Sequence, residues 1–346
     1  MNAQGNGPTK GSKTRKEKAP RYPHLEDEVR LEALDHHKRR LPLVIMPKRW
    51  NDHERLVQWV TERRWWLGEK LSTHGALLFR GFALDHFPQL DAVCKAISAD
   101  DSASTRVWRD GSTLHGAPAC SLMDDLLNPP RQIHLGALSV PAGPPQEATL
   151  VDFREVYQAL DANVVERFER KGLRVVRRYD IVDGVWGESD QGRIESKARQ
   201  LGFEVVWEDA TRARMTRNEE ATRVHERNGT PVWFNVTQEV AGRLAAESAK
   251  ERSDRLSNPH TFLHGLASTA IGAIERRISA EASLEVTFGD GSPVPQTDLE
   301  HIAQAIAKHT VHLAWKDHDL LVIDNLACGH GHAPSLRRHM MARAVL

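Results

Sequence analysis

The stretch "WKDHDLLVIDNLACGHGH" (residues 315–332) carries the most specific pattern in the chain. Its centre, "LLVID" (320–324), is an apolar run that ends in an aspartate, which is typical of a buried strand. The preceding run "TVHLAW" (310–315) predicts a second strand, and the short polar turn "KDHD" between the two predicts an antiparallel hairpin. Two histidines, His330 and His332, follow on the next loop, where the side chains of a binding site often lie.

Composition indicates a globular protein without a charge bias. The 346 residues and the 40% hydrophobic content are enough for a sizeable core. Lysine plus arginine and aspartate plus glutamate both number 47, so charge gives no reason to expect binding to nucleic acid or to an anionic membrane. We expect a cytoplasmic protein for three reasons. The three cysteines are dispersed, no apolar run is long enough to span a membrane, and the N-terminus has no apolar signal sequence.

The chain divides into a tail and one domain. Residues 1–22 are basic and rich in glycine and proline, with almost no apolar side chains, so we expect a disordered tail. Residues 23–346 form the domain. In it, a helical pattern starts at Asn51 and ends at His74-Gly75, and many short strand-like runs follow. Many short strands with Gly and Pro turns predict a β-sandwich or barrel with helical insertions.

Two aspartates are placed to cap helices. Asp152 and Asp161 precede two short helices, and a further helix is expected to start at Asp298 and to extend to residue 309. "RQIHLGALSV" (131–140) predicts a strand in which His134 is either a satisfied core histidine or a side chain that faces a cavity. A further helix is expected over residues 238–252.

Four further segments join residues 315–332 as landmarks in a fixed order. They are "HGALLFRGFALD" (74–85), "EATLVDFREVYQAL" (147–160), "GTPVWFN" (229–235) and "VTFGDGSPVP" (286–295). Together they resemble the TauD/TfdA family of Fe(II)- and 2-oxoglutarate-dependent oxygenases, most closely its SyrP-like branch, from about residue 40 to the C-terminus. The resemblance implies an α+β protein, mostly β, whose core is a double-stranded β-helix, or jelly roll, with helices outside it.

The resemblance also implies a metal site. Oxidation with 2-oxoglutarate needs Fe(II) on a facial set of two histidines and one carboxylate, which leaves positions for the keto acid and oxygen. The distance after Asp324-Asn325 places His330 at the second histidine position. His332 stands where the branch often has an arginine, so we expect it at the rim. Asp324 either orients a neighbour or caps the turn.

The keto acid needs a cation for its far carboxylate, and the planar fork of arginine suits a carboxylate. The last strand, "LRRHMMARAVL" (336–346), lies where the family keeps this arginine. Arg338 is the first candidate and Arg343 the second. Thr149 resembles the family threonine that assists at the same carboxylate, and a plain strand threonine is the alternative.

The loop expected to hold the first histidine and the carboxylate departs from the family pattern. It reads "STLHGAPACSLMDDLLNPP" (112–130), where His115 is the only histidine and Ala117 stands at the place of the carboxylate in His-x-Asp or His-x-Glu. This departure resembles a halogenase motif, His-x-Ala, in which the missing carboxylate frees a position for chloride beside Ala117.

Two alternatives to the halogenase motif stay open. In one, His115 remains a ligand and a lengthened loop brings Asp124 or Asp125 as the oxygen ligand. In the other, the site no longer binds iron productively, and strict spacing places Ala119 or Cys120 at the histidine position.

The expected activity is that of an Fe(II)/2-oxoglutarate-dependent hydroxylase in secondary metabolism. The expected substrate is a small molecule, either an amino acid or an acyl group tethered to a carrier protein, and this substrate class comes from the resemblance alone. A halogenase on the same scaffold and a non-catalytic binding protein are the alternatives.

Overall fold

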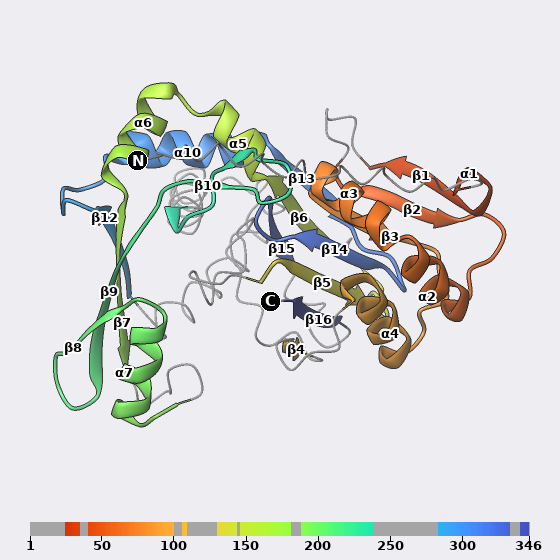
Figure 1. The fold of residues 1–346 in the computed structure, drawn as a ribbon, viewed down its shortest axis with the longest axis horizontal. Helices are drawn as coiled ribbons and strands as arrows, with labels where there is room; N and C mark the ends of the chain where they lie inside the picture. The colour runs from red at the N-terminus through yellow and green to blue at the C-terminus, as the bar shows by residue number, and fades with distance from the viewer. Residues whose placement is uncertain are drawn as a thin grey trace, which may run out of the picture.

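A computed structural model describes residues 25–34, 41–99, 106–108, 130–143, 146–180, 188–237, 283–332 and 340–345 of the protein (Figure 1). The described helices are α1 (Leu25–Glu28), α2 (His53–Glu62), α3 (Arg64–His74), α4 (Phe87–Ser98), α5 (Phe153–Ala159), α6 (Ala162–Lys171), α7 (Gln191–Gln200) and α10 (Gln296–Lys308). The described strands are β1 (Val29–Ala33), β2 (Leu43–Pro47), β3 (Ala76–Phe79), β4 (Arg106–Trp108), β5 (Gln132–Ala137), β6 (Glu147–Asp152), β7 (Leu173–Asp180), β8 (Glu204–Trp207), β9 (Arg212–Glu219), β10 (Arg223–Val224), β11 (Pro231–Val232), β12 (Ser283–Phe288), β13 (Thr310–Ala314), β14 (Leu320–Asp324), β15 (Cys328–His332) and β16 (Met340–Val345).

The largest sheet has seven strands in the order β1-β2-β3-β14-β5-β16-β4. All its pairs are antiparallel except β2 with β3. The "LLVID" run forms β14 near the middle of this sheet, and all five of its residues are buried. Helices α2, α3 and α4 cover one face, where Leu56, Trp59 and Leu90 pack with Leu77 and Phe79 in one apolar cluster. The amphipathic helices therefore bury their apolar side against the sheet.

A three-stranded sheet, β13-β6-β15, faces the other side of the large sheet. The apolar cluster between the two sheets contains Ala148 and Leu150 from β6 together with Leu135 from β5 and Ile323 from β14. This arrangement gives a mixed α/β fold with two sheets packed face to face, as in a sandwich. Closure of the sheets into a jelly roll is what the family resemblance implies.

The predicted hairpin of residues 310–324 is wrong. β13 pairs with β6 in the three-stranded sheet, whereas β14 pairs with β3 and β5 in the seven-stranded sheet. The short connection carries the chain from one sheet to the other. Its buried Asp319 accepts two hydrogen bonds from the guanidinium of Arg80, at 2.9 and 2.6 Å, and so fixes this corner. Two strands with a short connection can cross between packed sheets as well as pair with each other.

Other predicted elements differ at their ends. The helix expected from Asn51 is two helices, α2 and α3, which meet at Arg63, and the second ends at Gly75 with φ +79°. Asp152 caps α5 by accepting from the backbone N–H of Arg154 (2.9 Å). Asp161 occupies the N-cap of α6, but its side chain makes no capping hydrogen bond.

The chain also builds a separate four-stranded sheet, β12-β7-β9-β8, with α7 beside it (Figure 1). Ile194 and Ala198 of α7 pack with Ala213 and Met215 of β9 in a small apolar cluster. The tail (1–22) and the helix expected over 238–252 lie outside the described residues. Within the described part of the chain, no helix is long and apolar enough to cross a membrane.

Candidate metal and cofactor site

His330 lies on the inner face of the three-stranded sheet. It pairs with Leu150 across β15 and β6, and residues directly opposite in an antiparallel pair project to the same side. Leu150 belongs to the cluster between the two sheets, so the imidazole of His330 faces that space too. The residue is only 5% exposed, so its imidazole lies in the interior of the protein.

Asn325 ties the turn before His330 to the start of β5. Its backbone N–H donates to the carbonyl of Arg131 (3.1 Å), and its amide donates to the carbonyl of Pro130 (2.9 Å). Pro130 is the residue at which the "STLHGAPACSLMDDLLNPP" segment rejoins the described fold. The end of that segment therefore lies within one hydrogen bond of the turn that leads to His330.

A buried histidine that no sequence motif marks contacts this turn. His225, just after β10, places its Nε2 2.7 Å from Oδ2 of Asp324, and both residues are buried. The other oxygen of Asp324 accepts from the backbone N–H of Ala327 (3.3 Å). Asp324 therefore does both things considered for it, since it holds a neighbour and closes the turn.

A buried ion pair lies next to this turn. Arg154 donates twice to the carboxylate of Asp152, with both distances 2.8 Å, and also donates to the carbonyls of Ser72 and Thr73 at the end of α3. Burial opposes the charge of Arg154, yet the hydrogen bonds and charge of Asp152 leave its pKa above the ordinary value. The pKa of the nearby Cys328 thiol is raised by burial and then by Asp152, which makes it an inert core thiol.

Most of the chain matches one family of known proteins. The family model described as "Taurine catabolism dioxygenase TauD, TfdA family" matches residues 52–344. The chain belongs to the TauD/TfdA dioxygenase family. The match includes all five sequence landmarks and the whole region around His330.

Individual relatives are distant. The dapdiamide synthesis protein DdaC of Enterobacter agglomerans is 24% identical over 292 residues, which are 78% of this chain and 80% of that protein. A clavaminate synthase-like protein of Arabidopsis thaliana is 23% identical over 313 residues, 80% of this chain and 83% of that one. The crystal structure of AAD-2 in complex with Mn(II) and N-oxalylglycine superimposes with a TM-score of 0.50 at 12% identity, and the match covers 92% of this chain and 96% of that one, which shows the fold alone.

Within this TauD/TfdA fold, the structure does not bring Thr149 and His330 together. Ala148 and Leu150 both face the space between the sheets, so Thr149 projects to the opposite side of β6. It shares that side with its strand partner His312, whose side chain is 64% exposed. The hydroxyl of Thr149 is buried without a hydrogen-bond partner among the described residues.

Arg343 has a different partner from the one predicted for it. Its neighbour Met341 packs on the helical face of the large sheet, whereas Met340 packs between the sheets, so Arg343 also points toward the helices. Its guanidinium donates to Asp91 of α4 (2.9 Å) and is 3% exposed. Of the two predicted arginines, Arg338 therefore remains the candidate that would bind the keto acid.

His134 lies on the same helical face, opposite Arg343 in the strand register. It is fully buried, and its Nε2 is 3.0 Å from Oε1 of Gln132. Burial, with the charge of Arg343, lowers the pKa of His134 to about 3. His134 is a neutral core residue and does not face the space between the sheets.

The remaining predicted site residues lie outside the described residues. They are His115, Ala117, Ala119, Cys120, Asp124, Asp125 and Arg338. Among the residues that are described, no group of three or more His, Cys, Asp and Glu side chains could hold a metal ion. His330 is thus the predicted metal ligand that the described fold contains, and the other predicted ligands, His115 and Asp124, lie outside the described residues.

Proposed function

We propose that this protein is a catalytically active Fe(II)/2-oxoglutarate-dependent oxygenase of the SyrP-like branch, and that it hydroxylates a small molecule. The observation that carries the proposal is the placement of His330. It is an inward-facing histidine on β15, and its turn is tied by Asn325 to the end of the predicted ligand loop. Membership of the family, which uses Fe(II) and 2-oxoglutarate, supports it.

The surroundings of His330 fit a metal ligand. The residue is nearly buried and lies on the face of β15 that is turned toward the other sheet, and neutral imidazole is a common ligand of iron. In this proposal His330 and His115 hold the iron, Asp124 supplies the oxygen ligand, and Arg338 pairs with the far carboxylate of 2-oxoglutarate. Bound Fe(II) and 2-oxoglutarate would allow O2 to act as the oxidant: one oxygen atom would enter the succinate formed when the keto acid loses CO2, and the other would enter the substrate as a hydroxyl group.

The substrate class is part of the proposal. DdaC carries the name of a dapdiamide synthesis protein, and the Arabidopsis relative is named after clavaminate synthase. Both names point to small-molecule tailoring. We therefore propose an amino acid, or an acyl group tethered to a carrier protein, as the substrate.

Anaerobic titration with Fe(II) and 2-oxoglutarate tests the site directly. We expect a visible metal-to-ligand charge-transfer band in the wild-type protein and none in His330→Ala. His312→Ala is the matched control, because that histidine lies on β13 of the same three-stranded sheet and its side chain is 64% exposed. A folded wild-type protein without the band would contradict the proposal and favour a non-catalytic binding protein, and so would an unchanged band in His330→Ala.

A halogenase is the second candidate, because Ala117 stands where the family motif has its carboxylate. Chloride bound at the metal would then shift the charge-transfer band, and Ala117→Asp would abolish this shift. A band that is indifferent to chloride would remove the halogenase and leave the hydroxylase.

A further inference from the structure

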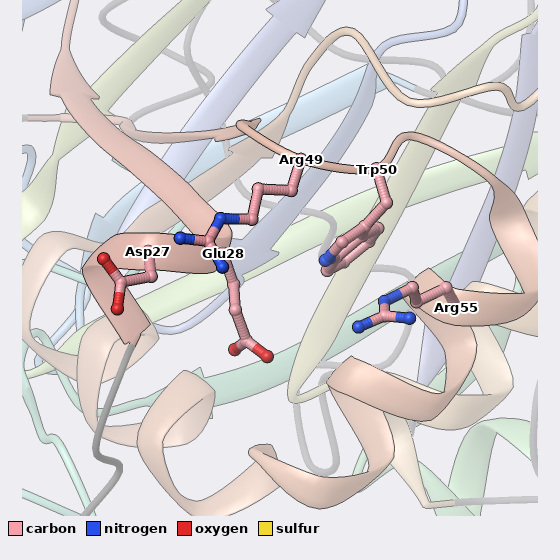
Figure 2. A pocket seen from close by; sticks show the side chains of 5 residues that line it. All are labelled: Asp27, Glu28, Arg49, Trp50 and Arg55. Atoms are coloured by element: carbon pink, nitrogen blue, oxygen red, sulfur yellow. The ribbon is translucent and has the colours of Figure 1, made fainter.

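A pocket lies at the edge of the seven-stranded sheet. It has a volume of about 410 Å³ and is lined by Asp27, Glu28, Arg49, Trp50 and Arg55 (Figure 2). The two acids come from α1, just before the edge strand β1, and the other three residues come from the segment after β2 and the first turn of α2. The pocket has the size of a small-molecule site. His330 belongs to the other sheet, so this pocket is separate from the candidate iron site.

Trp50 contributes a fixed donor that lacks an acceptor. Its ring packs against Phe82 (centroids 5.8 Å apart) and Trp59 (6.4 Å), which hold the indole in place. Its Nε1 is buried and has no hydrogen-bond partner among the described residues. Figure 2 shows this nitrogen turned toward the side of the pocket where Arg49 and Glu28 lie. A buried N–H without an acceptor is costly, so a ligand that supplies an oxygen would be favoured here.

Arg49 and Arg55 carry the positive charge of the pocket. Oε2 of Glu28 accepts from Trp59 (3.0 Å) and from Arg63 (2.6 Å), and Arg63 also pairs with Glu62 (3.0 Å). The guanidinium of Arg55 lies 5.6 Å from the centre of the Trp50 ring, and neither Arg49 nor Arg55 has a carboxylate partner within the described part of the chain. The lining is balanced in charge, with two guanidinium groups and two carboxylates, and because Glu28 is already paired with Arg63, Arg49 and Arg55 are the cations that an added anion would meet.

We propose that this pocket binds a small organic monocarboxylate. Its carboxylate accepts from the indole N–H of Trp50 and from the guanidinium groups of Arg49 and Arg55, which suit the planar oxyanion. A carboxylate brings a single negative charge to the two guanidinium groups, whereas a dianionic phosphate brings a second one close to Asp27 and Glu28, which repel it. The inference does not depend on iron or 2-oxoglutarate binding at His330.

The test uses the full chain labelled with 5-fluorotryptophan. The chain has nine tryptophans, and each gives a separate ¹⁹F signal. Trp50→Phe assigns the signal of residue 50. Benzoate is the probe, with phenyl phosphate and neutral benzyl alcohol as comparison ligands. We expect benzoate to shift the signal of residue 50 saturably, benzyl alcohol to leave it unchanged, and phenyl phosphate to bind more weakly.

The variants Arg49→Gln and Arg55→Gln each weaken benzoate binding about tenfold, because each removes a charge-assisted hydrogen bond. Arg30→Gln is the matched control, since this β1 arginine pairs with Glu32, does not line the pocket and has a 58% exposed side chain. The unshifted signals of the other tryptophans report that each variant is folded. The assignment is overturned if residue 50 shows no saturable shift, if the two pocket variants bind benzoate as tightly as Arg30→Gln, or if phenyl phosphate binds more tightly than benzoate.

Discussion

Removal of the Arg154 guanidinium tests how the region around His330 is held together. Arg154 is fully buried, and Asp152, which accepts two of its hydrogen bonds, has a side chain only 4% exposed. Arg154→Met would take away the guanidinium that pairs with this buried carboxylate, and it would leave the carbonyls of Ser72 and Thr73 without this donor. Breaking a buried pair from one side costs about 3–5 kcal/mol, so we expect a loss of unfolding free energy of about this size.

Urea unfolding followed by tryptophan fluorescence measures the loss as a lower midpoint at an unchanged slope. The double variant Asp152→Asn/Arg154→Met should recover most of it, because it removes the buried charge and keeps a good N-cap residue for α5. Arg212→Met is the control, since its 2.6 Å pair with Asp209 is exposed and should matter little. A loss below about 1 kcal/mol in Arg154→Met would refute the reasoning, because it would mean that water reaches Asp152 and stabilises its charge.

Three further variants test other parts of the structure. The unfolded chain takes up a proton at His134 below about pH 6.5, whereas the folded protein keeps this histidine neutral until about pH 3. The stability that His134 contributes above pH 6.5 is therefore lost as the pH falls. Between pH 6.5 and 4.5 the unfolding free energy of His134→Leu should fall by about 2–3 kcal/mol less than that of the wild type, as measured by urea unfolding at each pH. Asp324→Asn replaces the carboxylate of the 2.7 Å contact with His225 and should lower the unfolding free energy by about 1–3 kcal/mol in the same assay. An unchanged urea midpoint would show that this contact does not stabilise the fold. Gly289→Ala would place a Cβ 2.5 Å from the carbonyl of Lys171, so we expect a loss of at least about 1–3 kcal/mol, seen as a lower melting temperature.

The sequence predicted elements better than it predicted their partners. The apolar runs at 310–315 and 320–324 do form strands, but nothing in them tells which sheet each joins. The deciding contacts are distant: Leu313 pairs with Ala148 of β6, and Val322 pairs with His134 of β5. Local periodicity fixes the side that a strand buries, whereas its neighbours depend on packing across the whole core.

Two residues near the candidate site show what the sequence can and cannot predict about the position of a side chain. His225 was missed because it is 99 positions from Asp324 and belongs to no spaced motif, and its only local signal is the Asn-Gly turn that follows it. Thr149 could have been placed correctly, since Ala148 and Leu150 beside it are apolar and the two-residue period of a strand puts them on the buried face. A family motif predicts which residue type stands at a position, whereas the alternation of side chains along the strand determines which face of the sheet that side chain points to.

The contacts that position His330 involve no metal. β15 is held by its ladder to β6, Asn325 holds the turn to Pro130, and His225 holds Asp324 at the end of β14. Because these contacts come from the chain itself, we expect the fold to depend on iron less than a small zinc domain depends on its metal. If the predicted His-x-Ala motif at residues 115–117 is correct, it would alter metal affinity and leave these contacts of the two sheets in place, so membership of the family is compatible with that prediction. The metal titration, and not stability or fold, is consequently the measurement that separates an oxygenase from a binding protein built on the same two sheets.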